Sequence, residues 1–256
     1  MNQNKHRIGN FTSSEIAVLV KEGRSKGSMS AAAATYIEET DYERLLDRSI
    51  SDESNAKPLT WGKLLEARVF DILGLEYALL SDITTLHPGI DFWAGSPDGK
   101  KDSDSTIVDV KCPMTLASFC RLAQPLYDGL NGMSAMNAIR DNHKDGEKFY
   151  WQLVSNACIH NTANAELIVY MPYLSELPTV RMMANNVPLD QQSKHYWIAF
   201  GNDDELPHLL DGGYYKNLNT IRFEVPEEDK RYLTQKVQDA GKLLKPYLQT
   251  ETKDII

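Results

Sequence analysis

The sequence predicts an α/β protein in which a mixed central β-sheet is flanked by helices. Two amphipathic helical patterns, at 60–73 and 115–130, alternate with short apolar runs bounded by turn residues, and such runs are typical of strands. Neither an internal repeat nor a convincing linker interrupts this alternation over the 256 residues. Because alternating helices and strands pack as layers around one core, we expect a single α/β domain over residues 1–256.

The N-terminal section, residues 1–58, is predicted to be mainly helical. Thr12, Ser13 and Ser14, followed by Glu15 and an apolar run, are typical of a helix start with hydroxyl caps. Such a start presents free N–H groups and a positive dipole end, both of which attract phosphate. The expected elements are a helix beginning at 16–20, a turn at 23–30, a helix at 31–48 and a polar loop at 49–58.

Residues 60–73 give the clearest amphipathic helix. Its apolar positions recur with the 3.6-residue period of a buried helix face. Glu66 lies at the margin of this stripe, where a carboxylate can point into a site; the alternative is an exposed side chain paired with a neighbour. The apolar positions are Trp61, Leu64, Leu65, Val69, Ile72 and Leu73.

The remainder of the chain predicts further strands and helices. A C-terminal helix is expected to start at Pro226, with Glu227 and Glu228 in its first turn. Residues 131–148 are polar and contain glycine, so we expect a mobile loop there. The other expected strands are 77–80, 90–94, 106–111, 166–171, 195–200 and 221–225, and the other expected helices are 115–130 and 149–159.

Charge and composition exclude several classes of protein. The net charge of −9 argues against a nonspecific nucleic-acid coat protein. Residues 1–26 nevertheless carry more lysine and arginine than acid, which either a solvated face or a DNA contact would explain. No apolar run is long enough to span a membrane, and the polar N-terminus lacks a signal-peptide stretch, so we expect a cytoplasmic protein. The cysteines Cys112, Cys120 and Cys158 form no CxxC pair and are expected to be ordinary thiols.

The turn Pro97-Asp98-Gly99 and the following strand with Asp109 and Lys111 carry the strongest chemical signal. Side chains alternate along a strand, so Asp109 and Lys111 project to one side about 7 Å apart, while Val108 and Val110 project to the other. Asp98 joins them if the intervening segment folds back as a hairpin. Two carboxylates and a lysine would then form a site for a hard divalent cation and an activated water. Taken alone, Asp-x-Lys more often marks a solvated strand face with a weak ion pair.

The order of four elements adds to this signal: a helix with Glu66, the Pro97-Asp98-Gly99 turn, the Asp109-Val110-Lys111 strand and a helix with Gln152. This arrangement resembles the PD-(D/E)xK nuclease superfamily and, more narrowly, the phage lambda exonuclease or YqaJ-type viral recombinase family. The opening Arg7-Ile8-Gly9 with Thr12-Ser13-Ser14-Glu15, and the ending Lys111-Cys112-Pro113, resemble that family too. The resemblance covers residues 7–171 and implies a restriction-endonuclease-like core at 59–171, preceded by a phosphate-binding section at 1–58 and followed by strands and a helix at 172–256.

The resemblance implies a metal site. Asp98 and Asp109 would bind Mg²⁺ or Mn²⁺ together with the backbone carbonyl of Val110, and Glu66 would complete the shell directly or through water. Hard oxygen ligands of this kind suit magnesium. One or two ions can polarise a scissile phosphate and lower the pKa of water.

The resemblance also implies roles around the metal. Lys111 would orient or deprotonate the attacking water, and Gln152 would steady the lysine or the water. Arg7 and Ser14 would anchor a 5′-phosphate, since arginine grips phosphate with a planar fork.

Some positions depart from the family pattern or allow two interpretations. The second acid of the motif is Asp109, where glutamate is common, and the segment from Lys111 to Gln152 is long. Tyr150 and Trp151 either stack on a base or, as is more usual on such a helix, pack in the core.

The function implied is a metal-dependent 5′→3′ exodeoxyribonuclease that acts on double-stranded DNA ends in phage-type recombination and end resection. It would leave a 3′ single strand for an annealing protein and work as a ring-shaped homotrimer. Two alternatives stay open: a site- or structure-specific endonuclease on the same core, and a catalytically silent module that binds DNA ends.

Overall fold

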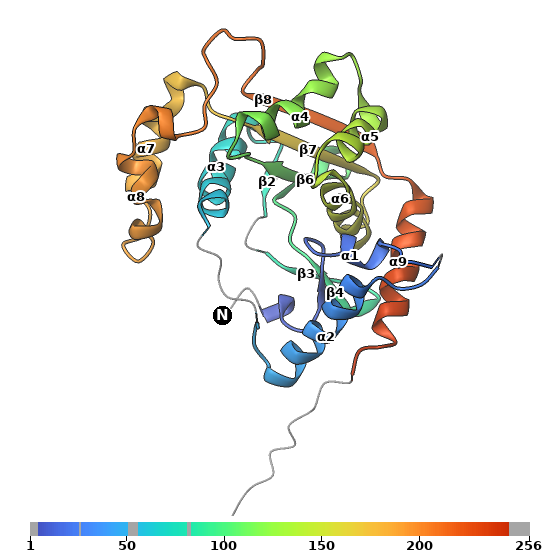
Figure 1. Ribbon diagram of the computed structural model, residues 1–256. Helices are drawn as coiled ribbons and strands as arrows, with labels where there is room; N and C mark the ends of the chain where they lie inside the picture. Colours follow the sequence, from blue (N-terminus) through green and yellow to red (C-terminus); the bar gives the residue numbers. More distant parts are fainter. Residues whose placement is uncertain (1–4, 26, 51–55, 81–82, 246–256) are drawn as a thin grey trace, which may run out of the picture.

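The computed structural model describes residues 5–25, 27–50, 56–80 and 83–245, and it contains a mixed five-stranded sheet and a three-stranded sheet (Figure 1). The strand order of the larger sheet is β2-β5-β6-β7-β8, with β6 and β7 parallel and the other neighbours antiparallel. Its strands are β2 (Ala78–Leu79), β5 (Gly99–Lys101), β6 (Thr106–Lys111), β7 (Asn164–Tyr170) and β8 (Leu218–Glu224). The predicted mixed α/β fold is confirmed.

The three-stranded sheet has the order β1-β4-β3 and leads directly into the Asp98 turn. Parallel pairing of β1 with β4 places Thr12 beside Ala94, so the N-terminal segment lies next to the chain that precedes Asp98. The strands are β1 (Phe11–Thr12), β3 (Thr85–His87) and β4 (Ile90–Gly95).

Helices cover both faces of the five-stranded sheet (Figure 1). On one face a hydrophobic core joins the sheet to α3 (Lys57–Leu73), α7 (Leu177–Asn185) and α8 (Gln192–Phe200). The core on the other face joins it to α1 (Ala17–Val20), α2 (Ala31–Leu46), α4 (Leu116–Tyr127), α5 (Gly132–Asn142), α6 (Gly146–His160) and α9 (Glu227–Gly241). Short 3-10 turns lie at Lys5–Arg7, Asp102–Asp104, Leu174–Glu176 and Asp203–Glu205.

Strand β6 shows the alternation expected from the sequence. Ile107 packs in the core that contains α6, whereas Val108 and Val110 pack in the core that contains α3. The predicted strand 106–111 therefore has the bounds and facing that the sequence indicated. Helix α3, which carries Glu66, also buries Trp61, Leu64, Leu65 and Val69 of the predicted stripe. At its C-terminal end the stripe is not buried, because Ile72 is exposed and Leu73 is half-buried.

Residues 131–148 are not the loop that the sequence suggested. They form helix α5 and the start of α6, joined by a short turn. Ser134 and Asn131 form a capping box at the start of α5, and Met136 and Ile139 are fully buried. The polar residues lie on the outer face of an amphipathic helix, which is why a composition-based interpretation failed.

Two other sequence predictions are wrong. Residues 195–200 belong to helix α8, where His195, Ile198 and Ala199 lie buried at helical spacing; the run had no strict alternation to support a strand. Helix α1 has four residues and begins after Ile16 without a side-chain cap. The hydroxyls that were expected to cap it contact other segments instead: Ser13, for example, bonds to Ser155.

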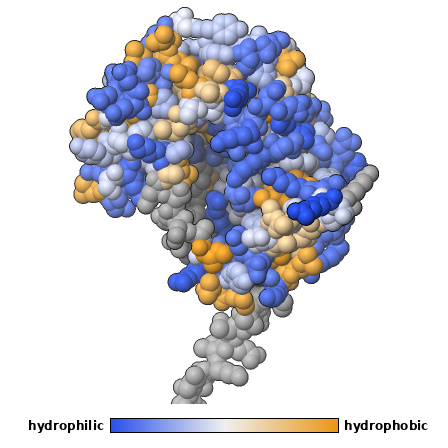
Figure 2. Space-filling model, in the orientation of Figure 1, coloured by the Kyte–Doolittle hydropathy of each residue, from blue (hydrophilic) through white to orange (hydrophobic). Residues whose placement is uncertain are grey.

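The face of the molecule shown in Figure 2 is mostly hydrophilic, and its exposed apolar side chains form separate patches, one of them over the α7–α8 region. Across the described ranges, every helix is too short or too polar to cross a membrane. Cys112, Cys120 and Cys158 are free thiols, as expected.

Candidate active site

The β5–β6 hairpin brings Asp98 to the motif on β6. Antiparallel pairing sets Gly99 opposite Val108, so Asp98 lies beside the end of β6 and its Oδ2 accepts a hydrogen bond from the Val110 N–H at 2.6 Å. Gly99 allows the hairpin to pack closely against α3 and β2, because a Cβ there would lie 2.3 Å from the Phe70 ring of α3 and 2.7 Å from the Ala78 carbonyl oxygen. The hairpin that the sequence analysis required is present.

Asp109, Lys111 and Gln152 form one hydrogen-bonded cluster between β6 and α6. Lys111 Nζ lies 2.5 Å from Asp109 Oδ2, and Gln152 Nε2 donates to Asp109 Oδ1 at 2.7 Å. Lys111 also donates to Gln152 Oε1 at 3.4 Å, and its ammonium lies over the Phe149 ring. Asp109 is fully buried. The amide of Gln152 is therefore oriented by both charged groups.

Electrostatic coupling ties Asp98 and Glu66 to this cluster. Burial raises the pKa of Asp98 well above its ordinary value, and repulsion from the carboxylates of Asp109 and Glu66 raises it further. Burial by itself would lower the pKa of Lys111, but attraction to Asp109 and Asp98 outweighs it and the net pKa is raised. The carboxylates of Asp98 and Asp109 thus both act on the one ammonium group of Lys111, and Glu66 adds negative charge beside Asp98.

The donor set fits a hard divalent cation. Asp98, Asp109 and Glu66 offer carboxylate oxygens. In an extended strand the N–H and C=O of one residue point to the same side, so the Val110 carbonyl faces the edge where its N–H meets Asp98. Within the described ranges, however, no three acidic, histidine or cysteine side chains stand ready to hold an ion. Lys111 and Gln152 occupy the oxygens of Asp109, and the Val110 N–H occupies one of Asp98.

A small hydroxyl-rich pocket adjoins this cluster. Arg7 Nη2 donates to Ser14 Oγ at 3.4 Å, and the two predicted phosphate-binding residues are therefore together. Residues that the sequence analysis did not identify complete the pocket: Thr84 and Ser96, whose hydroxyls lie 2.7 Å apart. Ser96 stands two residues before Asp98 in the chain, so this part of the pocket lining lies close to the carboxylate site. The full lining is Arg7, Thr12, Ser13, Ser14, Thr84, Ala94, Gly95 and Ser96, around about 20 Å³.

The expected basic excess of residues 1–26 is only partly visible. Residues 1–4 and Lys26 lie outside the described residues. Glu15 is ion-paired with Lys148 of α6 at 2.7 Å. Arg7 is exposed and adjoins the pocket, so it is the basic residue of this section best placed to meet a ligand.

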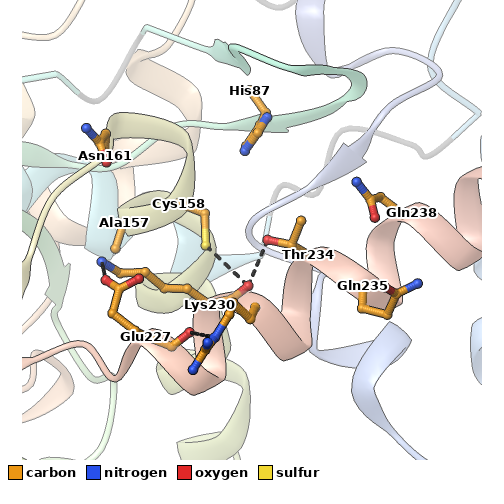
Figure 3. Close-up of a pocket in the computed structure, with 10 residues that line it drawn as sticks. His87, Ala157, Cys158, Asn161, Glu227, Lys230, Thr234, Gln235 and Gln238 are labelled. Carbon is orange, nitrogen blue, oxygen red and sulfur yellow. Dashed lines mark hydrogen bonds and ion pairs between the residues drawn. The ribbon is translucent and has the colours of Figure 1, made fainter.

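A larger open pocket of about 500 Å³ lies between α9 and the end of α6, with His87 opposite Thr234 and Gln238 (Figure 3). None of the predicted catalytic residues lines it. Its Lys230 side chain is already bonded to Glu227 and to the Thr162 carbonyl. We therefore place the candidate active site at the β6–α6 cluster because of the residues that it contains, although the other pocket has the larger volume.

Tyr150 and Trp151 are core residues. Tyr150 is fully buried and donates its hydroxyl to Asp229 of α9, and Trp151 is nearly so and donates to Glu147. The packing interpretation of these two rings is therefore correct, and neither is placed to stack on a base.

Comparisons with known proteins agree on the fold. No protein-family model matches the sequence, and no curated protein is similar to it in sequence. Among solved structures, the chain is similar to a phage-related exonuclease from Haemophilus somnus 129PT, with 16% identity over 91% of this chain and 92% of that one and a TM-score of 0.62. It is also similar to the alkaline exonuclease LHK-Exo from Laribacter hongkongensis, with 15% identity over 93% of this chain and 88% of that one and a TM-score of 0.55. The complex of LHK-Exo with dAMP matches at 15% identity over 94% and 90% of the two chains, with a TM-score of 0.56.

The five-stranded sheet and its flanking helices form a mixed α/β core that holds the Pro97-Asp98 and Asp109-Val110-Lys111 segments. More narrowly, the fold is that of the alkaline and phage-related exonucleases. The resemblance noted in the sequence is confirmed at the level of the fold.

Proposed function

We propose that this protein is a metal-dependent 5′→3′ exodeoxyribonuclease that acts on the ends of double-stranded DNA. The observation that carries the proposal is the convergence of Asp98, Asp109, Lys111 and Gln152 beside the pocket of Arg7 and Ser14. Residues suited to phosphodiester hydrolysis and residues suited to a terminal phosphate thus meet at the short segment from Ser96 to Asp98. The fold shared with exonucleases supports the same reading.

Mg²⁺, or Mn²⁺, would be held by Asp98, Asp109 and the Val110 carbonyl, with Glu66 bound directly or through water. When bound, the ion would supply Lewis-acid polarisation of the scissile phosphate and a more acidic water. The chain itself supplies orientation. Lys111 and Gln152 already hold Asp109 in one conformation, and Lys111 brings the positive charge that a phosphate approaching two carboxylates requires.

The Arg7 pocket would select the DNA end. The guanidinium can grip a terminal phosphate with parallel N–H donors, and Ser14 adds a hydroxyl. Thr84 and Ser96 add two further hydroxyls to the lining of the pocket. An end that carries a 5′-phosphate would therefore bind in one register relative to Asp98.

The wider role that we propose is end resection in phage-type recombination in the cytoplasm. The product would be a 3′ single strand that an annealing protein takes up. We further propose that residues 1–256 act as one nuclease domain and assemble as a ring-shaped homotrimer around DNA. Light scattering at micromolar concentration would give the mass of three chains; a monomer would refute the ring.

Digestion of a linear duplex tests the activity. The duplex carries a label at either end and a 5′-phosphate or a 5′-hydroxyl, and it is incubated with Mg²⁺ or with EDTA. We expect Mg²⁺-dependent loss from the phosphorylated 5′ end, absent in Asp109→Ala. Arg7→Ala should retain hydrolysis but lose the preference for phosphate.

Other outcomes assign other functions. Internal cuts, or cleavage of a closed circular duplex, would show a site- or structure-specific endonuclease. Metal-independent binding to ends without turnover would show a silent end-binding module. Wild-type cleavage by Asp109→Ala would refute the metal site itself.

A further inference from the structure

One face of helix α6 reaches both parts of the candidate site. Gln152, Ser155 and Asn156 follow at positions i, i+3 and i+4, so their side chains lie on the same face. Gln152 donates to Asp109 of the carboxylate cluster. Ser155 and Asn156, about 4.5–6 Å further along the helix axis, meet the segments that form the Arg7 pocket.

A hydrogen bond links Ser155 of α6 to Ser13, which lines the Arg7 pocket. It is fully buried. Trp93 Nε1, which can only donate, lies 2.8 Å from Ser155 Oγ, and Ser13 Oγ lies 2.7 Å from the same atom. The Ser155 proton is therefore free to point to Ser13, and the Ser13 hydroxyl in turn reaches the Ala94 carbonyl at 3.4 Å. Ser13 stands between Thr12 and Ser14 in the pocket wall.

Asn156 lies against Gly95, which also lines this pocket. Its side chain is fully buried, and among the described residues neither its Nδ2 nor its Oδ1 has a hydrogen-bond partner. A Cβ at Gly95 would lie 2.4 Å from Asn156 Oδ1 and 2.5 Å from Ser13 Oγ. Asn156 and Ser13 thus close on the backbone of Gly95, three residues before Asp98, and leave it little freedom.

We infer that Ser155, supported by Asn156, is a positioning residue that fixes the separation between the terminal-phosphate pocket and the hydrolytic carboxylates, and hence the length of the released product. The inference rests on the proposed function. A rigid helix carries Gln152 and Ser155 at a constant spacing, so the phosphate held by the pocket and the bond presented to Asp109 keep one register. Without the Ser155 hydroxyl, Ser13 and Trp93 lose a shared partner and the pocket wall can shift against α6.

The test compares Ser155→Ala with Ser118→Ala, which removes a hydroxyl bonded to the ring of His143 at 2.8 Å, outside the site. Products from 5′-phosphorylated and 5′-hydroxyl duplexes are sized by mass spectrometry, with rates measured for both. We expect one product length and a strong phosphate preference for the wild type and for Ser118→Ala. Ser155→Ala should give mixed lengths and a preference reduced about tenfold, the equivalent of roughly one hydrogen bond, while Mg²⁺-dependent hydrolysis persists.

Unchanged product length and unchanged preference in a folded Ser155→Ala would overturn the inference. If that variant fails to fold, Ser155→Cys, which replaces the hydroxyl by a somewhat larger thiol that forms weaker hydrogen bonds, is measured in the same way and decides. Failure of the proposed function looks different: the wild type itself would then show no preference for the phosphorylated end, or no exonucleolytic product, and the inference would fall with it.

Discussion

Asp98, which is half-buried, lies close to the fully buried Asp109. Glu66 is near enough to act on Asp98, and Lys111 is the cation beside Asp109. Like charges in a poorly solvated site repel, and taking them out of water costs further free energy. A protein that needed only stability would gain by removing one of the acids. Binding of a cation would offset this cost. The metal-free protein should therefore be destabilised by the repulsion between its carboxylates.

Replacing Asp98 with asparagine should raise stability in EDTA. The pKa of Asp98 is raised in the folded protein, so the folded state holds its proton more tightly than the unfolded chain. The free energy of unfolding of the wild type therefore falls as pH rises from the ordinary carboxyl pKa of 3.8 through the raised value. Asp98→Asn lacks this loss, and its advantage over the wild type should be larger at pH 8 than at pH 5.

Denaturant unfolding at both pH values, in EDTA, measures the effect. Asp102→Asn is the matched control, because Asp102 lies in the same hairpin but its side chain is exposed and paired with Lys100 at 2.8 Å. A lower stability of Asp98→Asn at pH 8 would contradict the view that repulsion dominates at Asp98.

Gln152 is a neutral residue that contacts both Asp109 and Lys111. Gln152→Ala removes the bonds to Asp109 and Lys111 and leaves a buried carboxylate with one partner fewer. We expect metal affinity or kcat to fall about 10- to 100-fold, as is usual when a group that orients a metal ligand is lost. Calorimetric Mg²⁺ titration and single-turnover cleavage separate the two effects. Gln124→Ala on α4 removes an amide oxygen that accepts a hydrogen bond from the Tyr215 hydroxyl, and it should change neither.

The sequence predicts Asp98, Asp109 and Lys111 as one cluster because a period of two on a strand and a motif spacing are both local signals, and it predicts Gln152 only through the resemblance in the order of elements. It did not identify Thr84 and Ser96. Their hydroxyls meet through the antiparallel pairing of β3 with β4, which sets Thr85 opposite Gly95. Nothing in the spacing of two isolated hydroxyl residues encodes that contact. The bond from Ser155 to Ser13 spans 142 positions and is equally invisible in the sequence.

The end of β4 is the element on which both sites depend. Gly95→Ala would bring a methyl group against Asn156, Ser13 and the Ile159 side chain, all within 2.8 Å of its position. Overpacking of this kind costs about 1–3 kcal/mol in the free energy of unfolding. Because the displaced groups border the Arg7 pocket, discrimination for the 5′-phosphate should weaken together with stability.

Gly89→Ala is the matched control for Gly95→Ala. It lies in the β3–β4 turn, and its added Cβ would meet nothing closer than 3.9 Å. Thermal melts and the ratio of rates on phosphorylated and hydroxyl ends report the two effects. If both variants have the same melting temperature and the same preference for the 5′-phosphate, the close packing at Gly95 does not affect stability or end recognition.

Helices α5 and α8 show why the sequence predicted a loop and a strand in place of these two helices. In α5 the buried Ala135, Met136 and Ile139 stand among the polar residues Ser134, Asn137 and Arg140 and follow a glycine, so composition indicated a loop. In α8 a short run of aromatic and β-branched residues favoured a strand, but packing against α3 and α7 makes it helical. Tertiary packing decides such short segments, and propensity alone does not.

The molecule as a whole is acidic, with a net charge of −9, and yet its proposed ligand is a polyanion. Many basic side chains are neutralised by partners of their own, among them Arg140 by Glu147, Arg222 by Asp104 and Lys148 by Glu15. Arg7 instead bonds the neutral hydroxyl of Ser14 and remains exposed. Recognition should therefore depend on a few local contacts at the DNA end and not on a broad basic surface.

This distribution of charge predicts a shallow salt dependence. For duplex DNA, log K falls with log [salt] by about 0.9 for each phosphate contacted. The slope for binding of catalytically inactive Asp109→Ala to a phosphorylated end in EDTA should correspond to only a few contacts. Adding Arg7→Ala should make it shallower by about 0.9, whereas Lys242→Ala, whose charge is paired with Asp239, should leave it unchanged. Fluorescence anisotropy between 50 and 200 mM NaCl gives the slopes. A steep slope that Arg7→Ala does not alter would mean that a basic surface elsewhere holds the DNA, and the Arg7 pocket would lose its role in end recognition.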